Sequence, residues 1–179
     1  DLIVSDKLAH ASLIDGARLS RARVAVFRHN DVQHARALLA DARGARRKLL
    51  VTEGVFSMDG DVAPLADLAS VALQSGAHLI VDEAHAAGVI GPAGAGAWAA
   101  AVAQGADATA LAARVVTGGK ALGLAGAFVV GSSRLRDVLI HRARSFVFTT
   151  APPPGLSAGL AQAIRCARRA DGARDLVRT

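Results

Sequence analysis

An apolar segment that ends on a carboxylate is the sharpest chemical feature of the sequence. Residues 78–82 read His-Leu-Ile-Val-Asp, and His85 follows Asp82 by three positions. In an open α/β sheet, ligands bind beyond the carboxyl ends of the strands, so both side chains are expected to face one crevice. A buried carboxylate must be paired or hydrogen-bonded to stay charged. The pattern therefore predicts a ligand site, although a turn-capping aspartate and a loop histidine would give the same spacing.

The string Asp-Glu-Ala-His at residues 82–85 also matches the box of nucleic-acid helicases that holds magnesium beside ATP. Such an ATPase needs a phosphate loop of the form G-x-x-x-x-G-K-[ST]. The nearest candidate, residues 114–121, has Arg114 in place of the first glycine and Ala121 in place of the hydroxyl residue. It also follows the acidic box, whereas helicases place the loop earlier. The sequence disfavours a nucleic-acid-dependent ATPase.

Lys120 lies between the glycine pair at residues 118–119 and Gly123, directly after an apolar segment. Glycines let a ligand approach the backbone closely. A lysine in this setting can contact a phosphate, form a Schiff base or simply be solvated. The other two lysines, Lys7 and Lys48, adjoin polar or basic neighbours and are expected to be solvated. Lys120 is therefore the candidate reactive amine.

Two further segments carry polar groups near expected strand ends. Residues 51–61 combine a strand end with two glycines, three acids and the hydroxyl of Ser57. His10 follows the first expected strand and could lay its flat imidazole over a planar ligand. A simple turn for the first segment and a surface position on a helix for His10 remain alternative interpretations.

Short β-branched segments alternate with Ala- and Leu-rich patterns of helical period, which is typical of βα units around a mainly parallel sheet. The expected strands are Leu2–Ser5, Val24–Phe27, Lys48–Thr52, His78–Asp82, Val115–Thr117 and Ala127–Gly131. The expected helices run from an Asp31 cap to about Arg43, from Pro64 to Ser75, from a Ser132 or Ser133 cap to Arg142, and from the prolines at 152–154 onward. Residues 93–113 are left unassigned. The fold class predicted is α/β.

Charge and composition bear on the possible partners. The 179 residues carry a formal charge of +6, which alone would suggest nucleic acid. The excess is spread along the chain as arginine, and the chain has 3% aromatic residues and no tyrosine, so a base-stacking surface is largely missing. The sequence has one cysteine, and it lacks both an apolar run of about 18 residues and a signal segment. These features favour a cytoplasmic protein. We expect small-molecule substrates, with no nucleic acid, membrane or metal.

Taken in their order along the chain, these segments resemble the α-oxoamine synthases, a branch of the fold-type I pyridoxal-phosphate enzymes. The string Glu-Gly-Val-Phe-Ser-Met-Asp-Gly-Asp at residues 53–61 is specific to this group. Asp-x-x-His and the lysine turn are shared with many pyridoxal-phosphate enzymes. The matching segments are residues 10–16, 29–31, 52–61, 82–85, 117–123 and 148–153. The resemblance thus covers nearly the whole chain.

The resemblance implies roles for individual residues. Lys120 would form an imine with pyridoxal 5′-phosphate, and Asp82 would pair with the protonated pyridine nitrogen, which keeps the ring an electron sink. Lys120, Asp82 and His10 would be the catalytic residues. The other implied cofactor contacts are His85 and Ser57 near the phenolic oxygen, His10 on the ring face, Thr117 at the phosphate, and Thr149 at the phosphate of the partner subunit in a homodimer.

The chemistry implied by the resemblance is a decarboxylative Claisen condensation carried out by an acyltransferase. In the nearest branch, which belongs to biotin synthesis, the amino acid is L-alanine and the acyl donor is pimeloyl-coenzyme A or its carrier-protein thioester. Other oxoamine synthases, 2-amino-3-ketobutyrate coenzyme A ligase and 5-aminolevulinate synthase, use a different amino acid and acyl donor. They remain alternatives.

By the same resemblance, residues 1–179 are the central part of the pyridoxal-phosphate-binding large domain, a three-layer α/β/α sandwich with a mostly parallel sheet. Both ends of the sequence look cut, and the N-terminal arm, the glycine-rich phosphate loop and the C-terminal domain are expected to lie outside it. The chain alone is therefore expected to be inactive, or only to bind or pair. Members of the family have a bulkier pair of residues at the position of Gly118-Gly119. A more flexible turn around Lys120 is therefore expected.

Overall fold

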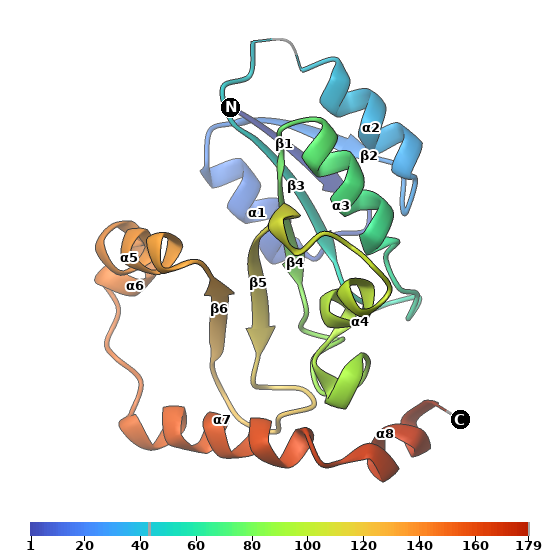
Figure 1. Ribbon diagram of the computed structural model, residues 1–179. Coiled ribbons are helices and arrows are strands. Elements are labelled where there is room, and N and C mark those ends of the chain that lie inside the picture. The colour runs from blue at the N-terminus through green and yellow to red at the C-terminus, as the bar shows by residue number, and fades with distance from the viewer. Residues whose placement is uncertain (43, 179) are drawn as a thin grey trace.

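A single sheet organises the chain in the computed structural model, which describes residues 1–42 and 44–178 (Figure 1). Its strands, in the spatial order β2-β1-β3-β4-β5-β6, are β1 (Leu2–Asp6), β2 (Arg23–Phe27), β3 (Lys48–Glu53), β4 (His78–Asp82), β5 (Leu111–Thr117) and β6 (Ala127–Gly131). Strands β1 to β5 run parallel, and β6 pairs antiparallel to β5. The mostly parallel sheet predicted from the βα alternation is confirmed.

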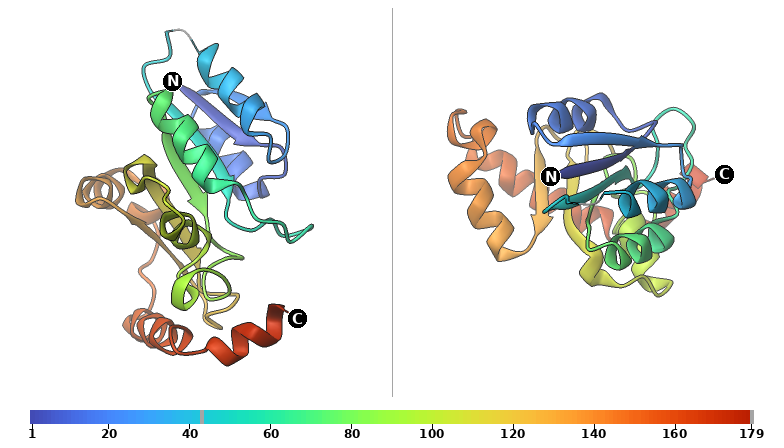
Figure 2. Two further views of the ribbon diagram at one scale, coloured as in Figure 1. Left: turned by 45° about the vertical axis from the view of Figure 1, so that its right-hand side comes forward. Right: turned by 90° about the horizontal axis from the view of Figure 1, so that it is seen from above.

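Helices cover both faces of this sheet, which gives the predicted α/β/α layers (Figure 2). Helix α1 packs on one face, and α2, α3 and α4 pack on the other. Helix α7 crosses the edge of the molecule at which β5 ends (Figure 1). The helices are α1 (Ala11–Leu19), α2 (Val32–Ala40), α3 (Leu65–Gln74), α4 (Ala97–Ala103), α5 (Ser133–Arg142), α6 (Arg144–Val147), α7 (Pro154–Ala167) and α8 (Asp171–Arg178), with 3-10 turns η1 (Pro92–Gly94) and η2 (Ala108–Ala110). Within the described residues, no helix is both long and apolar enough to span a bilayer.

The main core lies between the sheet and helices α2, α3 and α4. Leu50, Leu79 and Val81 on the central strands are fully buried there, as is Leu68 of α3. A smaller cluster beneath α1 contains Ile3 and other residues of the opposite sheet face. Because the central strands are covered on both faces, their sequences are apolar nearly throughout rather than alternating.

Several predicted boundaries differ from the structure. The helix capped by Asp31 ends at Ala40, before the predicted end at Arg43, a residue outside the described part of the chain. The unassigned residues 93–113 hold η1, α4, η2 and the first residues of β5, which starts four positions before the predicted Val115. This stretch is rich in alanine and glycine, and periodicity alone cannot tell whether its short apolar runs are helix or buried strand.

The last predicted helix is two helices, α7 and α8. Arg174 of α8 is buried, and its guanidinium donates to the carbonyl of Ala167 and pairs with Asp171. This contact satisfies a carbonyl at the end of α7 that has no partner inside the helix. The sequence around Ala167 carries no signal for the end of α7, because the residue that binds its last carbonyl, Arg174, lies seven positions further on.

A polar network ties the ends of β1 and β2 to the loop after β3. His29 contacts the carboxylates of Asp6, 3.0 Å away, and Asp61, 2.8 Å away. Asp6 is buried and also accepts the backbone N–H of Asn30 at 3.0 Å. The His29 ring meets the Phe56 ring edge to face, with 4.5 Å between centroids. His29 therefore fixes the 54–62 loop against the strand ends.

The network makes stability depend on pH. Burial lowers the pKa of His29, but the hydrogen bonds and charges of Asp6 and Asp61 outweigh burial and raise the pKa above its ordinary value. Because the folded state holds the proton more tightly, the stabilising contribution is complete below the ordinary pKa and is lost as pH rises through the raised one. We expect the free energy of unfolding in urea to fall over this window, and His29→Gln to remove that fall.

The matched control is His141→Gln, which changes an exposed histidine of α5. It should keep the pH dependence of the unmodified protein. Identical pH profiles for His29→Gln and the unmodified protein would refute this role of His29.

Candidate functional site

Neighbouring strands bring polar groups together at the carboxyl edge of the sheet. In the register of the sheet, Glu53 at the end of β3 lies opposite Asp82 at the end of β4, and Asp82 lies opposite Val115 of β5. Side chains alternate between faces along a strand, so Glu53, Asp82 and Thr117 project on the face that α1 covers. The sheet therefore gathers these polar side chains on one face at its carboxyl edge.

Asp82 is a buried carboxylate with one oxygen engaged. It is 7% exposed, and its Oδ1 accepts the backbone N–H of Ala84 at 2.9 Å. The turn-capping interpretation is therefore correct as far as this oxygen goes. The second oxygen has no hydrogen-bond partner in the described part of the chain, so the carboxylate can still bind a cationic ligand group.

His10 and His85 meet at Glu53. The backbone N–H of His10 donates to Glu53 Oε1 at 2.6 Å, and His85 Nδ1 lies 3.8 Å from Glu53 Oε2. The His10 side chain is exposed and caps α1 by accepting the N–H of Ser12 at 3.2 Å. The imidazole of His10 is therefore held at the rim of the site, as its predicted contact with a planar ligand requires.

Burial and the charges of the candidate residues shift the pKa values of His85 and Glu53. Burial lowers the pKa of His85, and the positive charge of Lys120 lowers it further, while Asp82 opposes the shift. Burial also raises the pKa of Glu53, with a contribution in the same direction from Asp82 and opposing ones from His10 and Lys120. Because β3, β4 and β5 are neighbours, Asp82, His85 and the turn with Lys120 lie at the same edge of the sheet, and Glu53 links His10 and His85 there. A neutral His85 imidazole is expected at neutral pH.

Glu53 is the member of this cluster that reasoning from the sequence did not single out. It is 2% exposed at the end of β3 and touches both histidines. The signal was present, since Glu53 ends an apolar strand as Asp82 does. Glu53 belongs to the site because the register of β3 on β4 places its carboxylate beside that of Asp82. That register cannot be read from one strand alone.

Backbone contacts hold the turn that carries Lys120. Gly118 donates to the carbonyl of Gly126 at 2.8 Å, Leu124 donates to that of Gly118 at 2.8 Å, and Gly123 donates to that of Lys120 at 3.0 Å. A Cβ on Gly118 would lie 2.4 Å from the Leu124 carbonyl oxygen, closer than real Cβ contacts. The first glycine is therefore required by close packing. The expectation of a more flexible turn around Lys120 stays a prediction.

A matched pair of substitutions tests this requirement. Gly118→Ala should lower the free energy of unfolding by about 1–3 kcal/mol, because the added methyl group forces backbone apart. Nothing lies within 4 Å of a Cβ placed on Gly119, so Gly119→Ala should change stability by less than about 0.5 kcal/mol. Urea unfolding measures both. Equal effects of the two substitutions would contradict the packing argument.

Glu83, the second residue of the Asp-Glu-Ala-His string, points into the protein. It is fully buried and accepts the backbone N–H groups of Ala97 at 2.8 Å and Trp98 at 2.9 Å. Arg114 Nη2 lies 3.2 Å from its Oε1. Glu83 thus holds the start of α4 against β5 and is not free to bind magnesium. This position argues against the helicase alternative, and no metal-binding group of histidine, cysteine or acidic residues occurs among the described residues.

The remaining predicted residues differ in how the structure places them. Thr117, near the end of β5, has a buried hydroxyl with no hydrogen-bond partner among the described residues. Ser57 lies exposed in the loop after β3, and Thr149 lies exposed between α6 and α7. No contact in the described part of the chain joins Ser57 or Thr149 to the cluster. Their roles stay predictions.

Comparison with known proteins agrees with this geometry. The sequence profile described as aminotransferase class I and II matches residues 1–176. The chain belongs to the class I and II aminotransferase family. It is 53% identical over 162 residues to the 8-amino-7-oxononanoate synthase of Anaeromyxobacter dehalogenans strain 2CP-C, which covers 90% of this chain and 40% of that protein. The resemblance to the oxoamine synthases is confirmed, and the chain spans about two fifths of the length of the curated relatives it matches.

Solved structures show the same fold. A serine palmitoyltransferase from S. paucimobilis with a bound pyridoxal-phosphate–myriocin ligand superimposes with a TM-score of 0.89 at 34% identity, over 98% of this chain and 43% of that one. The 8-amino-7-oxononanoate synthase of Francisella tularensis gives a TM-score of 0.81 at 32% identity, over 98% and 49%. Both similarities extend across the described sheet and helices.

Proposed function

We propose that this chain is part of a pyridoxal-phosphate-dependent acyltransferase that condenses L-alanine with a pimeloyl thioester. The products would be 8-amino-7-oxononanoate, carbon dioxide and the free thiol. The observation that supports the proposal is that Asp82 and His85 at the end of β4, and Lys120 in the turn after β5, follow two neighbouring parallel strands at the carboxyl edge of the sheet. The 53% identity to an enzyme of this name supports the choice of substrates.

The residues of the site suit the chemistry of this cofactor. Two buried polar atoms, Thr117 Oγ1 and His85 Nδ1, have no hydrogen-bond partner among the described residues, as expected of groups that await a polar ligand. Asp82 has a free carboxylate oxygen for a protonated ring nitrogen, and Lys120 has an exposed amine for covalent attachment. Thr117 would bind the phosphate, His85 with Ser57 the phenolic oxygen, and His10 the ring face.

When bound, the cofactor supplies an electron sink for the negative charge that develops at the α-carbon of the amino acid. Lys120 Nζ removes the α-proton and later returns a proton to the product. Asp82 keeps a proton on the ring nitrogen, because its negative charge favours the protonated form. Glu53 holds the backbone of His10, and the imidazole of His10 covers the ring. These residues position and protonate the reacting groups.

The overall condensation balances. A carbon–carbon bond forms between the α-carbon and the thioester carbonyl, the thiol leaves with a proton, and the carboxylate leaves as carbon dioxide. Thr149, exposed before α7, would contact the phosphate held by the partner subunit of a homodimer. The site would then be completed by two copies of the protein.

A second oxoamine synthase activity is the competing candidate. The structural match to a serine palmitoyltransferase, with a TM-score of 0.89, favours the use of L-serine and a long-chain acyl thioester. The two reactions share every step assigned above to Lys120 and Asp82. They differ only in the side chain of the amino acid and in the acyl chain.

A substrate matrix tests the proposal. The longest polypeptide that carries this sequence is supplied with pyridoxal phosphate, and L-alanine, L-serine or glycine is paired with pimeloyl, palmitoyl, acetyl or succinyl thioesters. Carbon dioxide and thiol should be released in equal amounts, fastest with L-alanine and the pimeloyl thioester. Fastest release with another pair of substrates would assign the protein a different oxoamine synthase activity. Release with no pair would reject the condensation.

A further inference from the structure

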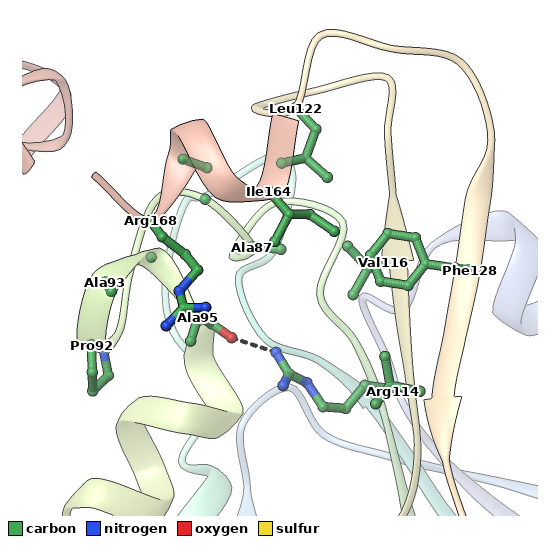
Figure 3. Close-up of a pocket in the computed structure, with 14 residues that line it drawn as sticks. Ala87, Pro92, Ala93, Ala95, Arg114, Val116, Leu122, Phe128, Ile164 and Arg168 are labelled. Atoms are coloured by element: carbon green, nitrogen blue, oxygen red, sulfur yellow. Dashed lines mark hydrogen bonds between the residues drawn. The ribbon is translucent and has the colours of Figure 1, made fainter. Parts of the chain in front are cut away.

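A cavity lies on the sheet face opposite the candidate site. Its volume is about 370 Å³, and Arg114 and Val116 of β5 line it together with Phe128 of β6 (Figure 3). These side chains alternate along β5 with Val115 and Thr117, so they point away from the face that carries Asp82. The cavity is therefore separate from the predicted cofactor site.

Most of the cavity wall is apolar. Val116 and Phe128 from the sheet face Ile164 of α7 across the cavity, and Leu122 closes one end (Figure 3). The backbone of η1, with Pro92, forms the opposite wall. A volume of this size with apolar walls and few polar groups is the usual form of a small-molecule site.

Two arginines supply the polar groups. The guanidinium groups of Arg114 and Arg168 approach the carbonyl of Ala95 from two sides and face the same space (Figure 3). Arg114 pairs with Glu83 at 3.2 Å and donates to the Ala95 carbonyl at 2.5 Å, yet its buried Nε has no partner within the described residues. Arg168 makes no ion pair with any carboxylate of the described chain. The Arg168 side chain is exposed to solvent as well as lining the cavity, so its guanidinium is available to an anion that enters.

From this combination we infer that the cavity binds an aliphatic carboxylate. The acyl chain lies between Val116, Phe128 and Ile164, and the carboxylate pairs with Arg168. Guanidinium groups bind carboxylates through charge-assisted hydrogen bonds, and the neutralised Arg114–Glu83 pair adds no second positive charge. A single negative charge is thus the complement of the cavity.

Chain length provides the first test. Binding of butanoate, hexanoate and octanoate to the longest polypeptide that carries this sequence is measured by calorimetry, with Ile164 observed by methyl NMR. Affinity should rise about fourfold for each methylene that enters the cavity, since burial of a methylene is worth about that factor. The Ile164 methyl resonance should shift on titration with octanoate, and that of Ile80, which packs on the opposite sheet face, should not.

Arg168→Gln provides the second test. It should weaken octanoate binding about tenfold and leave the binding of neutral octanol unchanged, because only the charge interaction is lost. Arg169→Gln changes an exposed arginine next in sequence that does not line the cavity, and it should behave as the unmodified protein. Affinity that does not depend on chain length, an unshifted Ile164 resonance, or equal octanoate affinity in both variants would overturn the inference. None of these outcomes depends on the proposed condensation, whose assay is separate.

Discussion

Lys120→Ala should reduce the rate of condensation by at least about 10⁴-fold. The substitution removes both the amine that attaches the cofactor and the group that moves the α-proton, and general acid–base catalysis alone contributes about 10² to 10⁴. The turn itself should survive, because its hydrogen bonds come from the backbone of residues 118–126. The loss is measured as the release of carbon dioxide and thiol from the best substrate pair.

Lys7→Ala is the matched control. Lys7 is exposed directly after β1, and its loss should leave the rate within about twofold of the unmodified enzyme. Lys48 is a poorer control than its sequence suggested, since its ammonium group donates to the carbonyl of Ser75 at 3.1 Å and is partly buried. A Lys120→Ala enzyme that retained a tenth of the activity would exclude the assigned role.

Asp82→Asn should lower turnover about 10³-fold while cofactor content falls much less. The neutral amide is nearly the same shape as the carboxylate, and its carbonyl can still accept the N–H of Ala84. It cannot supply the negative charge that keeps a proton on the ring nitrogen, and a single electrostatic contact of this kind is worth about 10² to 10³ in rate. Turnover and bound pyridoxal phosphate are measured on the same sample.

Asp67→Asn, in the first turn of α3 and exposed, controls for the loss of a carboxylate. It should change neither turnover nor cofactor content. Equal losses of turnover and cofactor in Asp82→Asn would mean that Asp82 only helps to bind the cofactor. Unchanged turnover in Asp82→Asn would show that Asp82 has no role in the reaction.

The alternation of strands and helices could be predicted from the sequence, because each central strand is covered on both faces and is apolar nearly throughout. The spatial order of the strands was not predicted and comes from the structure. Strand β4 was predicted with its observed limits, and the predicted cap Asp31 does accept a hydrogen bond from the next turn. Of the two candidate caps for α5, Ser132 and Ser133, the structure shows Ser132 in that role. The segment at residues 93–113 could not be assigned, since α4 begins where Glu83, fourteen residues earlier, binds Ala97. Long-range contacts of this kind have no local signature.

The site was predictable in its parts and not in its assembly. Asp82, His85 and Lys120 were identified from strand ends and glycines, and the structure places them after the neighbouring strands β4 and β5. Glu53 was missed because its proximity to Asp82 follows from the register of β3 on β4. The requirement for Gly118 was also hidden, since the atoms that exclude a side chain there belong to Leu124 and to Leu160 of α7.

The most direct test of the central claim is to find the lysine that binds the cofactor. The longest polypeptide that carries this sequence is incubated with pyridoxal phosphate, reduced with borohydride and digested, and the peptides are mapped by mass spectrometry. The pyridoxyl group should be attached to Lys120, with Asp82→Asn labelled at the same residue. Labelling of Lys7 or Lys48 in place of Lys120 would contradict the account.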